Sequence, residues 1–318
     1  MPVLFLKESD VRDLMDMEMS IEVVEKAFQA FSEKGCVNVP RVRATAPGLV
    51  LHTMSATAEY LGLAGWKAYT TTKSGARFHV AAYDLSSGEP IALIEADYLG
   101  QLRTGAASGV ATEYMARPDS KVVGIFGTGL QARTQLKAVC TVRKIERVEV
   151  YSRSEENRVR FAEEMTEYCD TEVIPVRSPD EAAWEKDIVI TATTSKTPLF
   201  DGRVLDVGTH LNVIGSNFMR KAEIDVTTVQ RADHIVCDSI EQCKMEAGDF
   251  REAISLGACE WESMHNLADV VAGQKTGRAT DDDITLFKSV GLAIEDVAMA
   301  GKLIELAREA NVGQSLPL

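Results

Sequence analysis

The sequence predicts an α/β protein in which helices cover both faces of a parallel sheet. Two observations lead to this prediction: short apolar runs alternate with helical segments after residue 118, and the first of these runs enters a glycine-rich turn. The chain has 318 residues, of which 45% are hydrophobic. At roughly 100–200 residues per domain, this length leaves room for two domains, each with its own core.

The residues before this alternation predict a helix followed by strands. Ser20 is expected to cap a helix whose apolar residues recur at helical spacing, and Gly35 is expected to end it. Two strand-like runs follow, at 66–70 and 80–84, with a turn at 86–88.

Small residues dominate the next segment, from Arg103 to Thr112. We expect this segment to form a helix at a domain junction, because small side chains let another backbone or a ligand approach closely.

The alternation after residue 118 supplies six expected strands: Val122–Phe126, Val148–Tyr151, Val173–Val176, Ile188–Ala192, His210–Gly215 and Ile235–Asp238. The last segment, from Thr285 to Ala310, carries apolar residues at helical spacing and predicts a long closing helix.

The glycine-rich turn is typical of dinucleotide binding. Gly127 permits the tight turn, Gly129 lets a pyrophosphate approach the backbone, and Ala132 is small enough for the helix to lie close to the strand. The helix start then presents free N–H groups to the phosphates. The predicted cofactor contacts in this turn are Gly127, Thr128, Gly129, Leu130 and Gln131.

The end of the second strand indicates which dinucleotide is bound. An NAD site places a carboxylate there for the ribose hydroxyls, whereas this chain has Ser152, Arg153 and Ser154. Two hydroxyls and a guanidinium suit a 2′-phosphate, so we expect NADP(H) to be preferred, with NAD(H) possible. The alternative is that Arg153 is a solvent-facing turn residue.

Charge and composition exclude several classes of protein. The net charge of −14 disfavours nucleic-acid and anionic-membrane partners. The start of the chain lacks a basic segment followed by a long apolar one, and no later stretch is long and apolar enough to span a membrane. The six cysteines show no close-paired spacing, and neither they nor the histidines have metal-ligand spacing. We therefore expect a cytoplasmic protein with reduced thiols and no metal.

Three cations stand in apolar or small-residue surroundings: Arg43, Lys67 and Arg103. Each one alone is more often an ordinary surface cation. Beside a nicotinamide site, however, the three together form a cluster of the kind that holds a substrate carboxylate, because arginine can bind it in bidentate fashion.

These features together resemble the ornithine cyclodeaminase/mu-crystallin family, which includes alanine dehydrogenases and ketimine reductases. The resemblance runs nearly from end to end, and its motifs are Arg43, Lys67, 102–107, 127–132, 211–217 and 287–296. It implies a Rossmann domain, residues 119–283, inserted in an α+β substrate-binding and dimerisation domain, residues 1–118 and 284–318. It also implies a homodimer.

The resemblance assigns roles to single residues. Arg43, Lys67 and Arg103 are expected to hold the substrate carboxylate, and Thr104 to contact the nicotinamide half of the cofactor. The loop at Gly291 and Leu292 is expected to line the pocket. Lys67, if its pKa is lowered by burial, is the candidate proton donor.

Asn217 departs from the cyclodeaminase pattern, which has aspartate at this place. Asparagine forms hydrogen bonds but cannot serve as a general base. With the turn at 152–154, this favours an NADP(H)-linked imine reductase or amino-acid dehydrogenase acting on a small carboxylate-bearing amine or imine. The alternatives are an NAD-dependent ornithine cyclodeaminase and a non-catalytic mu-crystallin-like protein that binds NADPH and a small ligand.

Overall fold

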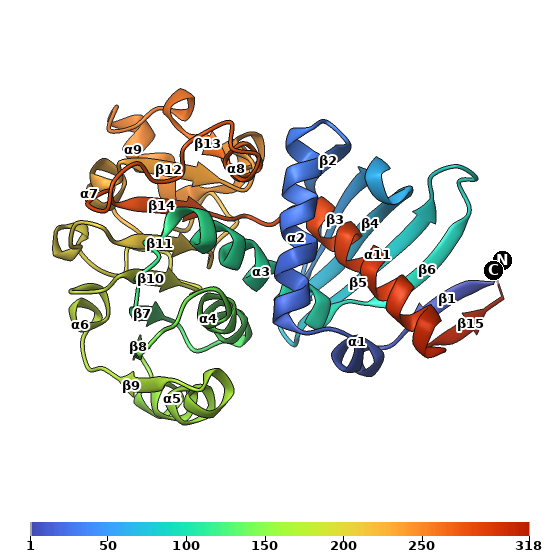
Figure 1. Cartoon of the computed structure of the whole chain (residues 1–318), viewed down its shortest axis with the longest axis horizontal. Coiled ribbons are helices and arrows are strands. Elements are labelled where there is room, and N and C mark those ends of the chain that lie inside the picture. Colours follow the sequence, from blue (N-terminus) through green and yellow to red (C-terminus); the bar gives the residue numbers. More distant parts are fainter. Residues whose placement is uncertain (1, 318) are drawn as a thin grey trace. The chain divides into compact units, whose positions relative to one another are not determined.

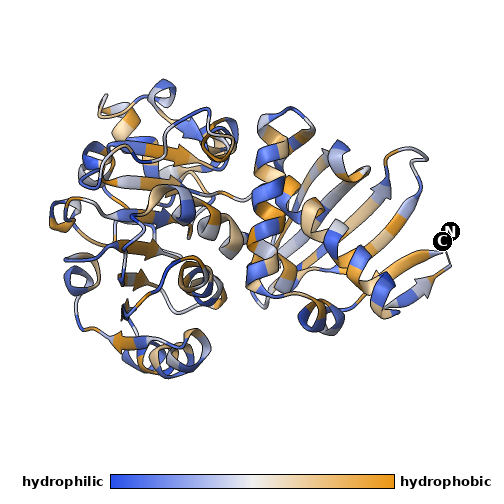
Figure 2. Cartoon of the chain, viewed as in Figure 1, coloured by the Kyte–Doolittle hydropathy of each residue, from blue (hydrophilic) through white to orange (hydrophobic). Residues whose placement is uncertain are grey.

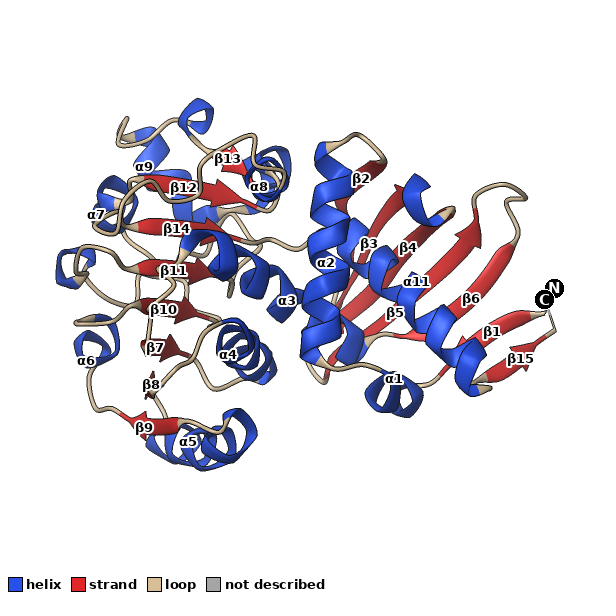
Figure 3. Cartoon of the chain, in the orientation of Figure 1, coloured by secondary structure: helices blue, strands red, loops and turns tan. Residues whose placement is uncertain are grey.

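The computed structural model describes residues 2–317. They divide into two compact units (Figures 1 and 3). The first unit contains the residues up to Arg103 and those from Leu292 onward, and the second runs from Thr104 to Gly291. None of the helices in residues 2–317 has both the length and the apolar character needed to cross a membrane.

The first unit is built on a seven-stranded sheet of order β15-β1-β6-β5-β4-β3-β2. Strands β2 to β6 form an antiparallel meander, β1 joins β6 in parallel, and β15 pairs antiparallel with β1. The bounds are β1 Val3–Leu6, β2 Cys36–Ala46, β3 Leu49–Ala58, β4 Leu63–Thr72, β5 Gly75–Asp84, β6 Pro90–Glu95 and β15 Gln314–Leu316.

Two long helices cover one face of this sheet: α2, Met17–Ser32, and α11, Ala293–Ala310. Figure 2 shows α2 banded in blue and orange, as expected of an amphipathic helix. The helix starts earlier than expected from Ser20, because the Asp16 side chain accepts a hydrogen bond from the Met19 N–H at 2.8 Å and is the N-cap. A short helix, α1, Glu8–Leu14, precedes it.

Helix α3, Asp97–Met115, contains the small-residue segment, and the boundary between the two units falls inside it. The Glu8 carboxylate accepts hydrogen bonds from the N–H groups of Asp97, at 3.1 Å, and Tyr98, at 2.8 Å. It therefore satisfies amide groups that the first turn of a helix leaves unpaired.

The second unit contains an eight-stranded parallel sheet of order β13-β12-β14-β11-β10-β7-β8-β9. The six strands expected from the sequence are confirmed to within two residues: β7 Val122–Phe126, β8 Arg147–Tyr151, β9 Glu172–Pro175, β10 Ile188–Thr191, β11 His210–Val213 and β12 His234–Cys237. Two further strands are β13 His265–Asn266 and β14 Thr285–Lys288.

Helices connect these strands. Their bounds are α4 Leu130–Val142, α5 Glu155–Cys169, α6 Pro179–Ala183, α7 Val226–Arg231, α8 Ile240–Glu246, α9 Arg251–Ser255 and α10 Leu267–Val271.

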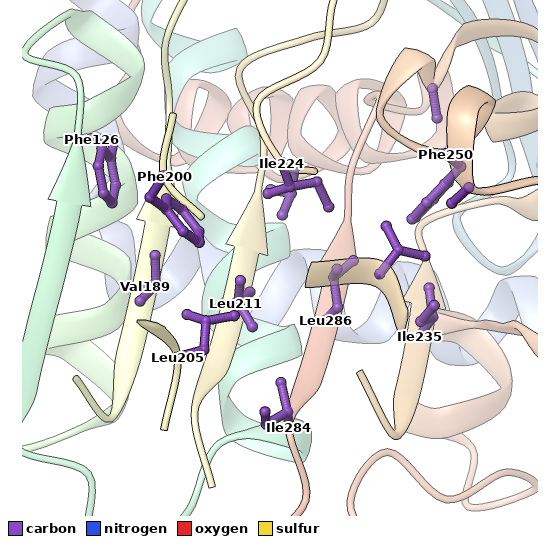
Figure 4. Packing of buried hydrophobic residues seen from close by; sticks show 14 of the residues in the cluster. Phe126, Val189, Phe200, Leu205, Leu211, Ile224, Ile235, Phe250, Ile284 and Leu286 are labelled. Atoms are coloured by element: carbon purple, nitrogen blue, oxygen red, sulfur yellow. The ribbon is translucent and has the colours of Figure 1, made fainter. Parts of the chain in front are cut away.

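Hydrophobic clusters lie on both faces of the parallel sheet. Side chains on one face pack against α4 and α5, among them Ile125 and Ile190. On the other face, successive strands each contribute a buried apolar side chain, which Figure 4 shows side by side: Phe126, Val189, Leu211, Leu286 and Ile235. The fold therefore is the α/β arrangement that the alternation predicts.

The end of the chain differs from the expected long helix that starts at Thr285. Residues 285–288 form β14, which pairs in parallel with β11 and β12, and the helix begins only at Ala293. The two compact units divide between residues 103 and 104 and between residues 291 and 292. The domain boundaries expected from the sequence lie between 118 and 119 and between 283 and 284.

Candidate functional site

The glycine-rich turn joins β7 to α4 in the second unit. Gly127 has φ +106°, and a Cβ atom there would lie 2.4 Å from the Ala192 carbonyl oxygen, so this position requires glycine. Gly129 is the N-cap of α4, and no heavy atom of the protein lies within 4 Å of the position that a Cβ atom would take there. Ala132 is fully buried against the sheet. An open cradle at a helix start fits the pyrophosphate of a dinucleotide.

Arg133 fixes the shape of this turn, a role that the sequence analysis missed. Its Nη1 donates hydrogen bonds to the carbonyls of Thr128, at 2.7 Å, and Gly129, at 3.1 Å. The same guanidinium pairs with Glu164 of α5, with Nε–Oε1 at 2.6 Å. The turn is therefore held by the protein's own side chains.

The turn after β8 contains the three residues expected near the adenosine ribose. The Ser154 hydroxyl caps α5 by accepting from the Asn157 N–H, and Ser152 exchanges hydrogen bonds with the backbone of Ser154. Arg153 is exposed. Arg158 places a second guanidinium beside this turn, because its Nη1 donates to the Ser152 carbonyl at 3.0 Å. The sequence alone did not indicate this residue.

The three cations that the sequence predicts to hold the substrate lie in the first unit. Lys67 on β4 is 2% exposed and Arg103 on α3 is 7% exposed. Arg43 on β2 lies opposite His52 on β3, which in turn pairs with Tyr69, two residues along β4 from Lys67. Because paired residues and alternate residues share a face, these side chains lie on one face of the sheet.

Two buried carboxylates from the start of α11 complete this cluster. Lys67 Nζ lies 2.7 Å from Asp296 Oδ1, and Arg103 Nη1 lies 2.8 Å from Glu295 Oε2. Both acidic residues lie within the motif 287–296, but the sequence alone indicated no role for them. Acidic residues in a first helical turn usually signal only a favourable helix start.

Burial and charge perturb two groups in this cluster. Burial and the neighbouring Arg103 lower the pKa of Lys67 to about 8, although Asp296 opposes the change. Burial, Arg43 and Arg41 lower the pKa of His52 to about 4, so this imidazole is neutral near pH 7. A lysine that titrates near pH 8 can exchange a proton with a substrate.

Asn217 belongs to the loop that follows β11 in the second unit. The two residues before it are anchored: the Gly215 N–H donates to Glu223 at 2.7 Å, and Lys288 Nζ donates to the Ser216 carbonyl at 2.9 Å. Lys288 also forms a buried ion pair with Asp249, at 2.7 Å. This network was not predicted, although a lysine inside the apolar run 284–290 is an unusual feature.

The loop at Gly291 is anchored by a buried aspartate. The Asp238 carboxylate accepts from the N–H groups of Val290 and Gly291, each at 2.7 Å, and from the Ser289 hydroxyl at 2.9 Å. Gly291 has φ +82°. Leu292, the N-cap of α11, belongs to the first unit and is fully buried.

The predicted site residues are thus divided between the units. Arg43, Lys67, Arg103 and Leu292 lie in the first unit. The second unit contains Gly127–Gln131, Ser152–Ser154, Asn217, Gly291 and Thr104, whose carbonyl accepts a hydrogen bond from Gln135 at 2.9 Å.

Known proteins resemble the chain over its whole length. The chain is 34% identical to Δ1-pyrroline-2-carboxylate reductase of Bacillus cereus, with 99% of each chain covered. Its structure matches that of the Thermococcus litoralis Δ1-pyrroline-2-carboxylate reductase in complex with NADH and L-proline, with 37% identity, a TM-score of 0.95 and coverage of 99% and 100%. It also matches an archaeal alanine dehydrogenase dimer with bound NAD, with 32% identity, a TM-score of 0.94 and full coverage of both chains.

A family model agrees with these similarities and with the motifs described above. The model of the ornithine cyclodeaminase/mu-crystallin family matches residues 2–311. The chain therefore belongs to the ornithine cyclodeaminase/mu-crystallin family.

Proposed function

We propose that this protein is a nicotinamide-dependent oxidoreductase that reduces a small imino acid to an amino acid or catalyses the reverse reaction. The observation that carries the proposal is the buried Lys67, whose pKa is lowered to about 8 and whose ammonium lies in a cluster with Arg103. Such a cluster can both hold a carboxylate and supply a proton. The similarity to pyrroline-2-carboxylate reductases supports a cyclic imine as the first substrate to test.

The reaction requires two electrons and two hydrogens. When bound, a reduced nicotinamide supplies hydride to the imine carbon. Arg43 and Arg103 hold the substrate carboxylate, which orients the imine carbon. The protonated Lys67 would break one Nζ–H bond as the imine nitrogen gains its proton, so the products would be the amine, the oxidised nicotinamide and a neutral lysine, which takes up a proton from water before the next turnover. In the oxidative direction the neutral lysine takes the proton back.

The turn at 127–131 would hold the pyrophosphate, with Thr104 toward the nicotinamide half. Ser152, Arg153 and Arg158 support a preference for NADP(H), because no carboxylate stands in residues 152–154 and two guanidiniums lie at or beside this turn. The 2′-phosphate of NADP would gain charge-assisted hydrogen bonds there.

We further propose a homodimer, as in the archaeal alanine dehydrogenase. The two long helices near the ends of the chain do not supply its surface, since the apolar sides of α2 and α11 are buried within the first unit. Exposed apolar side chains instead lie on the face of β2 and β3 opposite His52: Val37, Val39, Val42, Leu49 and Leu51. A second copy of the chain would cover them.

The test is a screen of imino acids, and of keto acids with ammonia or amines, with NADH or NADPH absorbance as the readout. Oxidation of cofactor with Δ1-pyrroline-2-carboxylate or a related imine, at a rate that depends on enzyme concentration, is expected. If no imino acid is reduced while the protein binds NADPH, the proposal is wrong and a non-catalytic binding protein is favoured.

A further inference from the structure

One carboxylate oxygen at the start of α11 faces two cations from different elements. Asp296 Oδ1 lies 2.7 Å from Lys67 Nζ on β4 and 3.2 Å from Arg103 Nε on α3. The neighbouring Glu295 pairs with Arg103, at 2.8 Å. The two consecutive acidic residues thus differ: only Asp296 contacts the lysine.

A favourable helix start does not account for Asp296. An acidic side chain also interacts favourably with the helix dipole when it is exposed to solvent, so this interaction does not require burial. Asp296 instead is fully buried, which costs free energy unless close partners compensate. Its second oxygen, Oδ2, has no hydrogen-bond partner among the described residues.

The surroundings of Lys67 leave little freedom for its ammonium. A Cβ atom at Gly100 of α3 would lie 3.1 Å from Nζ, so glycine makes room for the lysine end. On another side the ammonium lies over the Phe78 ring, 5.2 Å from its centroid.

Charged residues on three neighbouring elements act on Lys67. Arg103 from α3 and Arg41 from β2 oppose its protonation, and Asp296 from α11 favours it. Arg43 and Glu295 add one charge each to the cluster, whereas His52 of β3 is neutral near pH 7 because its pKa is lowered to about 4. Asp296 is therefore the carboxylate that directly favours the ammonium form of Lys67.

We propose that Asp296 is a positioning residue of the reaction: it holds Lys67 beside Arg103 and keeps Lys67 protonated, so that the lysine is ready to give its proton to the imine nitrogen. This inference rests on the proposed function, because it assigns a partner to the lysine of the same site.

The test compares Asp296→Asn with the matched variant Glu295→Gln, in which the charge is removed one residue away. Two readouts are followed from pH 6 to 10: the side-chain NMR signal of Lys67, assigned with Lys67→Arg, and kcat for reduction of Δ1-pyrroline-2-carboxylate.

In the unmodified enzyme, kcat should fall as the pH rises through about 8, because Lys67 loses the proton that it donates. In Asp296→Asn both midpoints should move down by about one unit or more, since an adjacent opposite charge shifts a pKa by roughly 1–3 units. In Glu295→Gln the Lys67 midpoint should move much less.

Equal shifts in the two variants, or no shift in either, would overturn the proposal. Dinucleotide binding and circular dichroism check that each variant is folded. If Asp296→Asn does not fold, Gly100→Ala replaces it, because a methyl group there pushes Nζ away from the carboxylate; an unchanged Lys67 midpoint in that variant would also count against the proposal. If the unmodified protein reduces no imine, the NMR titration still tests Asp296 while the proposed function fails separately.

Discussion

The guanidinium of Arg158 donates a hydrogen bond to the backbone carbonyl of Ser152 at 3.0 Å, which places a cation directly beside the turn that follows β8. We predict that kcat/KM is higher with NADPH than with NADH. Arg158→Ala should weaken NADPH binding by about ten- to hundredfold, because a charge-assisted hydrogen bond is worth roughly 1.5–3 kcal/mol. NADH binding should change less.

A second variant, Ser152→Asp, should also weaken NADPH binding, since a carboxylate would face the 2′-phosphate. Titration of cofactor fluorescence gives both affinities, and a preference of the unmodified enzyme for NADH would contradict this interpretation of the turn.

The three substrate cations allow a direct test of the site. Arg43→Ala and Arg103→Ala should each lower kcat/KM by about ten- to hundredfold, the loss expected for one charge-assisted hydrogen bond. Lys67→Ala should lower it by at least as much, because the variant also loses the proposed proton donor. Cofactor affinity should be retained, because the glycine-rich turn lies in the other unit. Lys73→Ala is the matched control, since Lys73 is an exposed cation of the same unit. A cation whose variant behaves like the control does not bind substrate.

His52 predicts how acid affects stability. Its pKa is about 4 in the folded protein against an ordinary 6.5, so the unfolded chain binds a proton that the folded chain does not between these values. Stability is therefore lost as the pH falls from 6.5 toward 4. Between pH 7 and pH 5, His52 should lower the free energy of unfolding by about 2 kcal/mol. The variant His52→Gln should not show this part of the loss. Urea unfolding at pH 7 and pH 5 measures the difference, and equal losses in the variant and the unmodified protein would refute it.

Asn217 predicts the response to ornithine. Without a carboxylate at this position, the protein should release little or no ammonia from ornithine with either oxidised cofactor, since an amide cannot take a proton from the terminal amine. Asn217→Asp is expected to raise this activity. Proline and ammonia are followed over time in both proteins. Rapid ammonia release by the unmodified protein would favour a cyclodeaminase over a reductase.

The exposed face of β2 and β3 predicts the oligomeric state. Val42→Asp and Leu51→Asp should convert the proposed dimer to a monomer, because a charge would be buried without a partner in the interface. Leu256→Asp is the control, since Leu256 is an exposed apolar residue of the second unit. Light scattering after size-exclusion chromatography gives the mass. A dimer that survives both changes must use another surface.

The parallel sheet was predictable because strands buried on both faces are continuous apolar runs, as 122–126 and 188–191 are. β14 was not predicted because its four residues precede a helical pattern and merge with it. The substrate cations stood out by their apolar surroundings, whereas the partners of Lys67 and Arg103 did not. Glu295 and Asp296 follow them by about 190 residues or more, and only the tertiary fold brings these side chains together.

Strand β14 also sets the point in the chain at which the second sheet can be completed during synthesis. It is the last strand of the second unit in the chain, yet it lies between β11 and β12 inside the sheet. Until Thr285–Lys288 leave the ribosome, the two neighbouring strands have open edges with unpaired backbone groups, and such edges can pair with other chains. A nascent chain that stops before residue 285 therefore leaves two unpaired strand edges inside the sheet, where a strand of another chain could pair instead of β14.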